Sequence, residues 1–251
     1  MEKMVEKMGL YDIWIVFFPG AFFLIAVKTL YNFMLSLPEY ISKATGVIEQ
    51  MFIFCKAKVY IPDSIYELFV FSLCAYFIGL ILHEISSIFK SRVMYKEGKP
   101  VDFLLDSYGE VFDEEQINAL MPMYIRLYEK PFTLNDREKL KKESRIIFRK
   151  INAELQRKKI ANQYVKLNIV YNTCATLGVA TMLILCMIAL FEVEFIFLKR
   201  YDALFSVTVL DVLLVICIYF FISRSKKYYK YWVQNIVLAY QDIYLDTNME
   251  A

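Results

Sequence analysis

A run of 25 residues without a charged side chain, residues 167–191, most constrains how this chain can fold. As a helix the run is about 37 Å long, which exceeds the ~30 Å hydrocarbon core of a bilayer. The chain as a whole is 58% hydrophobic, and nearly all of its 29 Lys and Arg and 27 Asp and Glu lie outside such runs. The sequence therefore predicts an integral membrane protein.

Three further charge-poor windows predict three more membrane spans. The first covers residues 13–37 and is interrupted by Lys28. The second covers residues 68–89, and the last covers residues 203–223 and has Asp211 as its only charge. Pro19 and Gly20 predict a kink in the first window, either a packing kink or a gating hinge, because proline lacks a backbone donor. We therefore expect an all-α integral membrane protein with four transmembrane helices.

The predicted spans divide the chain into four parts. Residues 1–90 hold two spans and an outer loop, 91–166 form a helical cytoplasmic domain, 167–223 hold two spans, and 224–251 form a short cytoplasmic helix. The segments assigned to the cytoplasm contain 23 Lys and Arg residues, and the outer loops contain five. Because basic residues are enriched on the cytoplasmic side, both termini are expected there.

Small and polar residues form a stripe on one face of the second span. Ser72, Ala75, Gly79 and His83 recur at three- and four-residue spacing, and Ser86 continues the row. The Ala75 and Gly79 pair fits the small-x-x-x-small pattern that lets membrane helices approach closely. The stripe either packs within one protomer or lines a subunit interface or a water-filled path.

Ionisable residues within the predicted spans are few. The carboxylate of Asp211 must be neutralised, paired or hydrated there, so it joins the stripe as a candidate pore residue. His83 and Glu84 begin a zinc-protease helix motif whose second histidine is missing. The five cysteines show no metal or disulfide spacing. No metal, cofactor or catalytic site is predicted.

The segment between the second and third spans carries a cationic helix. Arg137, Lys141, Arg145 and Arg149 follow at four-residue steps, which places them in one row over three turns. Three explanations stand: a solvated face near anionic lipids, a binding site for an acidic ligand such as a nucleotide or short nucleic acid, or pairing with the acidic first half of the same segment in a neighbouring subunit.

Two features predict how the helices outside the membrane begin and end. Asn135 and Glu138 resemble a helix-start capping pair, and neither proline nor glycine follows until Gly178. One continuous helix is therefore expected to enter the third span. Residues 224–232 combine Arg and Lys with Tyr and Trp, which is typical of an anchor at the membrane interface.

Three short motifs resemble known proteins. They are Tyr11-Asp12-Ile13 leading to Phe18-Pro19-Gly20, the stretch Tyr76-Phe77-Ile78-Gly79 up to His83, and the basic-aromatic residues 224–232. These motifs are similar to those of small four-span bacterial membrane proteins from anti-phage defence loci, with the Hailong and Kiwa membrane components as the nearest comparisons. The resemblance implies a bacterial inner-membrane protein and a homo-oligomer, for which we expect a tetramer.

The resemblance leads to two hypotheses. A Hailong-like component implies an ion channel controlled by single-stranded DNA oligomers that a partner nucleotidyltransferase makes. A Kiwa-like component implies a non-conducting sensor or scaffold working with a soluble DNA-binding partner. The polar stripe and Asp211 favour the channel, with the cationic row as its ligand site. A membrane-embedded enzyme comes third, because a single histidine leaves little from which to build a catalytic site.

Overall fold

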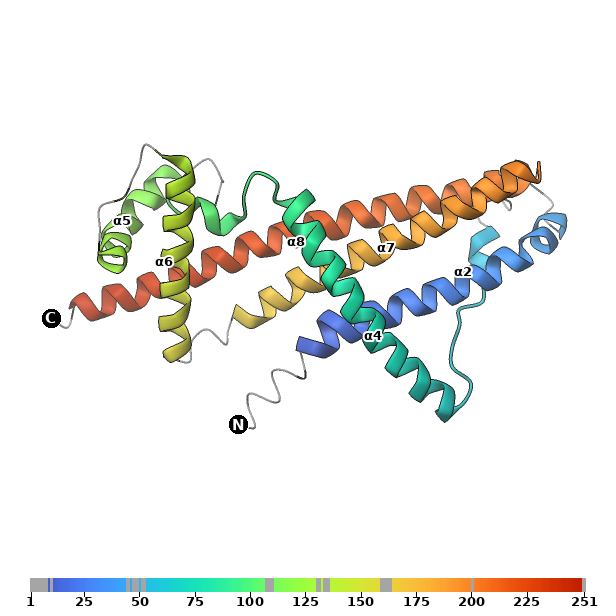
Figure 1. Ribbon diagram of the computed structural model, residues 1–251, viewed down its shortest axis with the longest axis horizontal. Helices are drawn as coiled ribbons and strands as arrows, with labels where there is room; N and C mark the ends of the chain where they lie inside the picture. Colours follow the sequence, from blue (N-terminus) through green and yellow to red (C-terminus); the bar gives the residue numbers. More distant parts are fainter. Residues whose placement is uncertain are drawn as a thin grey trace. The chain divides into compact units, whose positions relative to one another are not determined.

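The structure, a computed structural model, describes residues 9, 11–43, 46, 50, 53–106, 111–129, 132, 136–158, 164–199 and 201–249. Every regular element in these ranges is helical (Figure 1). Four helical stretches are long and apolar enough to cross a membrane, which confirms the predicted number of spans. They are Ile13–Lys43, Ile65–Met94, Val165–Phe197 and Val207–Leu245.

The chain divides into two compact units. The span unit comprises Met1–Lys90 and Asn172–Ser225, and the polar unit comprises Ser91–Tyr171 and Lys226–Ala251. The middle segment and the tail, which were predicted to be two parts, therefore belong to one unit.

The span unit is held together by two apolar clusters. One joins three helices through Leu37, Ile188 and Val207, and the other joins two helices through Leu82 and Ala180. In Figure 1, α2, α7 and α8 run side by side in this unit, and α4 crosses α2 obliquely. The elements of the unit are η1 (Ile13–Phe17), α2 (Phe18–Lys43), η2 (Ile53–Lys56), α4 (Ile65–Phe89), and the span-unit parts of α7 (Val165–Phe197) and α8 (Tyr201–Met249).

The turn before Pro19 is widened. η1 is a π-helical turn, in which the backbone N–H of Phe18 donates to the carbonyl oxygen of Ile13. Pro19 has no N–H to donate, and its ring would collide with a carbonyl of a regular preceding turn. The extra residue in the turn accommodates the ring, so the first span continues as α2 without a break.

Glycines allow the first and second spans to touch backbone to backbone. A Cβ atom at Gly20 would overlap the carbonyl oxygen of Ala75, and one at Gly79 would overlap the carbonyl oxygen of Val16. Such close approach between membrane helices requires small residues on both sides. Ala75 and Gly79 of the stripe are therefore buried against α2 of the same chain.

The polar unit has its own core. Tyr124, Ile147, Ile151 and Val237, among others, are almost completely buried in it. α5 begins with a capping box in which Asp113 accepts a hydrogen bond from the backbone N–H of Gln116 at 2.7 Å. The elements of the unit are η3 (Lys90–Met94) from Ser91 onward, η4 (Pro100–Phe103), α5 (Glu114–Tyr128), α6 (Arg137–Arg157) and the last part of α8.

The limits of α6 differ from the prediction. Its first residue follows Asp136, whose carboxylate accepts from the backbone N–H groups of Glu138 and Lys139, whereas Asn135 lies outside the described residues. The helix ends at Arg157, and α7 begins at Val165. The expectation of one continuous helix is therefore wrong: Lys158, with ψ near 0°, closes the last turn without glycine or proline.

The expectation of a separate tail helix is also wrong, because α8 runs unbroken from Tyr201 to Met249. Of the aromatic residues of the predicted interface anchor, Tyr229 lies in the core of the polar unit, Tyr228 and Trp232 pack against that core, and Tyr231 is exposed. Tyr229 stacks on Tyr171 with ring centroids 4.6 Å apart, and Trp232 packs edge-on against Phe148 at 5.3 Å. Burial in an aromatic stack replaces the predicted anchoring role for these two rings.

Candidate functional site

A group of polar residues lies buried within the span unit, where α4 ends. We call His83, Ser86, Lys90, Asn172 and Thr176 the polar cluster. The ammonium of Lys90 donates to Oδ1 of Asn172 at 2.7 Å, and Thr176 donates to the backbone carbonyl of Asn172 at 2.9 Å. Lys90 is only 8% exposed, although a buried charge is costly in any protein interior.

Two atoms of the polar cluster have no hydrogen-bond partner in the part of the chain that the structure describes. They are Nδ1 of His83 and Oγ of Ser86, and both are buried. Buried polar atoms are nearly always paired with protein groups or with water. His83 also interacts electrostatically with Lys90. This arrangement provides a polar, hydratable region between α4 and α7.

The remaining predicted pore residues lie elsewhere. Ser72 donates to the carbonyl of Leu68 in its own helix at 2.7 Å. Asp211 on α8 lies within hydrogen-bonding reach of Glu192 on α7, and its Oδ1 atom has no partner among the described residues. The prediction grouped Asp211 with His83, but the contacts place them in two separate groups.

Most of the predicted cationic row is engaged within the chain. Arg145 binds Asp102 through two hydrogen bonds, Nε to Oδ1 at 2.5 Å and Nη2 to Oδ2 at 2.8 Å. These bonds to a nearly fully buried carboxylate raise the pKa of the Arg145 guanidinium. Arg137 pairs with Asp106 at 3.7 Å. The row is therefore largely a structural surface that joins α6 to η4.

The other two members of the row differ from each other. Lys141 pairs with Glu138 at 2.8 Å and also lies over the ring of Phe103. Arg149 is exposed. Pairing with acidic residues of a neighbouring subunit was one of the three predicted explanations, whereas Arg145 and Arg137 pair with Asp102 and Asp106 of their own chain.

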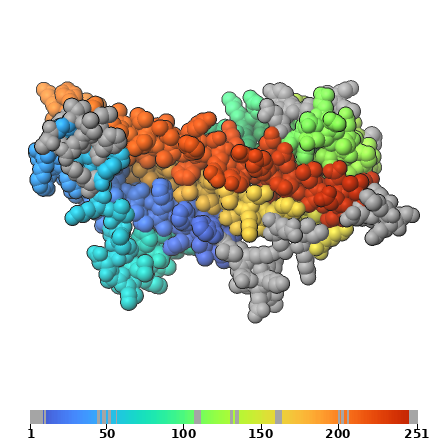
Figure 2. Space-filling view, turned by 180° about the vertical axis from the view of Figure 1, so that it is seen from behind, coloured from blue at the N-terminus to red at the C-terminus, as the bar shows by residue number. Residues whose placement is uncertain are grey.

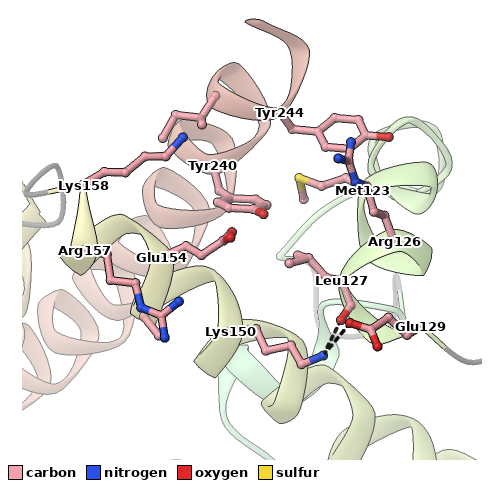
Figure 3. A pocket seen from close by; sticks show the side chains of 12 residues that line it. Met123, Arg126, Leu127, Glu129, Lys150, Glu154, Arg157, Lys158, Tyr240 and Tyr244 are labelled. Atoms are coloured by element: carbon pink, nitrogen blue, oxygen red, sulfur yellow. Dashed lines mark hydrogen bonds and ion pairs between the residues drawn. The ribbon is translucent and has the colours of Figure 1, made fainter. Parts of the chain in front are cut away.

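A pocket opens on a neighbouring face of α6. Its volume is about 450 Å³, within the range of small-molecule sites, and α5, α6 and α8 all contribute to it (Figure 3). We call it the basic pocket. Its charged and aromatic lining residues are Arg126, Glu129, Lys150, Glu154, Arg157, Lys158, Tyr240 and Tyr244.

Some of the charges in the basic pocket are already engaged. Lys150 donates to the backbone carbonyl of Leu127 at 2.6 Å and approaches Glu129 at 3.8 Å. Arg126 lies over the ring of Tyr244. In Figure 3, Glu154 and Tyr240 occupy the middle of the pocket and point toward each other.

Arg157 and Lys158, at the end of α6, are exposed and make no ion pair with the described residues. Figure 3 shows Lys158 and Arg126 on opposite sides of Tyr240. The pocket thus combines the exposed Arg157 and Lys158 with tyrosine rings. An anionic ligand with an aromatic portion could use both.

Sequence reasoning missed three groups of residues that the structure brings together. Lys90 continues the stripe of α4, four residues after Ser86, so the spacing contained a signal for it. Asn172 and Glu192 carried no such signal, because their partners lie on other helices. The basic pocket combines three distant segments, which no local spacing reveals.

Comparisons with known proteins find no relatives. No protein-family model matches the chain, and no curated protein or solved structure matches it. In the described part of the chain, no three His, Cys, Asp or Glu side chains group as they would around a metal ion.

Proposed function

We propose that this protein is a homo-oligomeric ion channel of the bacterial inner membrane. It acts as an effector in anti-phage defence, under the control of an acidic ligand such as a nucleotide or DNA oligomer. The observation that carries the proposal is the polar cluster. Polar and ionisable groups within membrane-spanning helices are costly and usually mark ion or substrate pathways. The unpaired atoms of His83 and Ser86 favour hydration of this region.

Lys90 offers the test of conduction. A buried ammonium beside a conducting path favours anions over cations. Lys90→Met removes the charge and keeps a similar length, so the reversal potential under a salt gradient should shift toward cation preference. Lys96→Met, at an exposed position in the polar unit, is the matched control and should leave the reversal potential unchanged. Identical ion selectivity in Lys90→Met and Lys96→Met would show that the polar cluster does not line the ion path.

The basic pocket supports the proposed ligand control. Arg157 and Lys158 supply charge that the described acidic residues do not neutralise, and the tyrosine rings offer stacking surfaces. Phosphate groups bind such cations, and bases stack on aromatic rings. The acidic ligand is therefore assigned to this pocket in preference to the cationic row, where Arg145 is already bound to Asp102.

Charge reversal separates the two candidate ligand surfaces. Arg157→Glu with Lys158→Glu should abolish binding of a short single-stranded DNA, because the pocket would then repel phosphate. Lys141→Glu with Arg149→Glu reverses the same charge on the cationic row and should leave binding close to wild type. Fluorescence anisotropy with a labelled oligonucleotide at fixed salt measures both. Loss of binding only in the second variant would return the ligand site to the row.

A non-conducting sensor or scaffold that recruits a soluble partner is the second candidate. One observation favours it: Ala75 and Gly79, the centre of the stripe, contact α2 of the same chain. These two residues are then used for packing within the protomer. A folded oligomer that binds DNA and passes no current would support this alternative.

A further inference from the structure

An apolar groove runs along the first span, on the face where α2 meets α7 and α8. Its lining includes Phe18, Ala26 and Phe33 of α2, Ile188 of α7 and Leu214 of α8, and Val59 of the segment after η2 also lines it. Among the described residues that line the groove, Thr29 is the one with a polar side chain. Figure 2 shows the face on which α2, in blue, lies next to the orange part of α8.

The groove is long. It follows α2 from Phe18 to Phe33, which corresponds to about 22 Å of helix. Its volume is about 470 Å³. Because the groove belongs to a membrane-spanning helix and is lined by apolar side chains, a lipid hydrocarbon chain matches it in polarity.

A cation lies beside the groove at the level of Thr29. Lys28 precedes Thr29 in α2, and its ammonium lies 5.3 Å from the centre of the Tyr60 ring. The backbone N–H of Tyr60 donates to Oγ1 of Thr29 at 3.1 Å, which fixes the segment after η2 against α2 at this level. Lys28 is exposed, and a lysine within a span extends its ammonium toward the lipid headgroups.

We propose that this groove binds one acyl chain of an anionic phospholipid, whose phosphate contacts Lys28. The apolar lining accepts the hydrocarbon, because an empty apolar groove would lose the dispersion contacts that packing provides. The charge of Lys28 selects an anionic headgroup over a zwitterionic one. This inference rests on the span unit alone and does not depend on conduction or on the basic pocket.

Native mass spectrometry of the full chain in a mild detergent tests the proposal. The wild-type protein, extracted from membranes containing phosphatidylglycerol and phosphatidylethanolamine, should retain one phospholipid per chain, with phosphatidylglycerol enriched. Ala26→Trp fills the groove and should reduce the amount of retained phospholipid at least about tenfold. A tenfold change in affinity corresponds to about 1.4 kcal/mol of binding free energy. Ile81→Trp places the same ring on the exposed face of α4 and should retain lipid as the wild type does.

The headgroup is tested separately. Lys28→Gln should lower the preference for phosphatidylglycerol about fivefold, as expected for one lysine near an anionic headgroup, and leave total retention nearly unchanged. Lys58→Gln, an exposed lysine in the segment after η2, is the charge-matched control. If Ala26→Trp does not fold, wild-type and Lys28→Gln protein in nanodiscs with equal amounts of both lipids still test the preference.

Three results would overturn the proposal. Equal lipid retention by Ala26→Trp and Ile81→Trp would show that the groove is not the binding site. An unchanged headgroup preference in Lys28→Gln would show that Lys28 does not contact the headgroup. If the wild-type protein retains no lipid and the Ala26→Trp substitution dissociates its oligomer, the groove binds a second copy of the chain.

Discussion

Asp102 is the residue on which the cationic row of α6 depends. Its carboxylate is buried, accepts the backbone N–H of Lys99 at 2.9 Å, and receives two hydrogen bonds from Arg145. A buried carboxylate that loses its cation remains desolvated without compensation. The pair therefore holds η4 against α6, and its removal should loosen the polar unit.

Arg145→Ala should lower the stability of α6 by about 3 kcal/mol, because it leaves the Asp102 carboxylate uncompensated. Hydrogen exchange of the α6 amides in the purified protein measures this change. Arg149→Ala, on the same helix face and exposed, should change the protection by less than about 0.5 kcal/mol. Equal protection in both variants would mean that the pair contributes nothing to stability.

Asp136 makes the start of α6 sensitive to pH. Its hydrogen bond with the backbone N–H of Lys139 lowers the pKa of the carboxyl group below 3.8. Stabilisation by this cap is therefore present above the unfolded-state pKa and is lost as pH falls through the lower folded-state pKa. Protection of the first α6 amides should be constant above pH 5 and fall in the acid range below 3.8.

Asp136→Asn is the control for this titration. Asparagine keeps an oxygen acceptor for the cap and does not ionise, so the acid-dependent loss should disappear. The same fall in protection in the variant would assign the pH dependence to another group.

The crossing of α4 over the first span is the central contact between elements. Gly20 and Gly79 let the two backbones meet, and any Cβ atom there overlaps main-chain atoms, which cannot rotate away. Gly178 of α7 differs from them. A Cβ atom at that position would meet Phe221 and Ile222 at 3.5 and 3.7 Å, ordinary van der Waals distances.

Gly79→Ala should therefore destabilise the protein by about 2 kcal/mol or more, the cost of overpacking against backbone. Gly178→Ala should be neutral or stabilising, because alanine has the higher helix propensity. Thermal unfolding in detergent, followed by loss of the monodisperse peak in gel filtration, compares the two. If Gly79→Ala and Gly178→Ala have equal melting temperatures, the close crossing does not exist in the protein.

The length and hydropathy of charge-poor windows predicted the number of spans, but residue spacing did not predict the ends and contacts of the other helices. Length and hydropathy are enough to identify a span, because the bilayer thickness sets the requirement. The end of α6 at Arg157 could not be predicted, because no glycine or proline lies there in the sequence. Tyr229 and Trp232 fit a membrane interface by composition, yet an aromatic stack in a core uses the same residues. Spacing likewise found the cationic row but not its partner Asp102, 43 positions away.

At the scale of the whole molecule, the span unit contains the polar cluster and the polar unit contains the basic pocket. In the function proposed above, the polar cluster is the region that water enters, and the pocket is the place of the acidic ligand. Binding can control conduction only if the ligand favours one of two conformations over the other. The proposed function therefore requires a current that an acidic ligand changes.

Single-channel recording from the purified protein in a planar bilayer, with and without short single-stranded DNA, is the direct test of ligand-controlled conduction. We expect discrete currents that the DNA changes, and currents that no longer respond to DNA in the Arg157→Glu, Lys158→Glu variant. Silence with and without DNA, from protein shown to be folded and oligomeric in the same membrane, would contradict it.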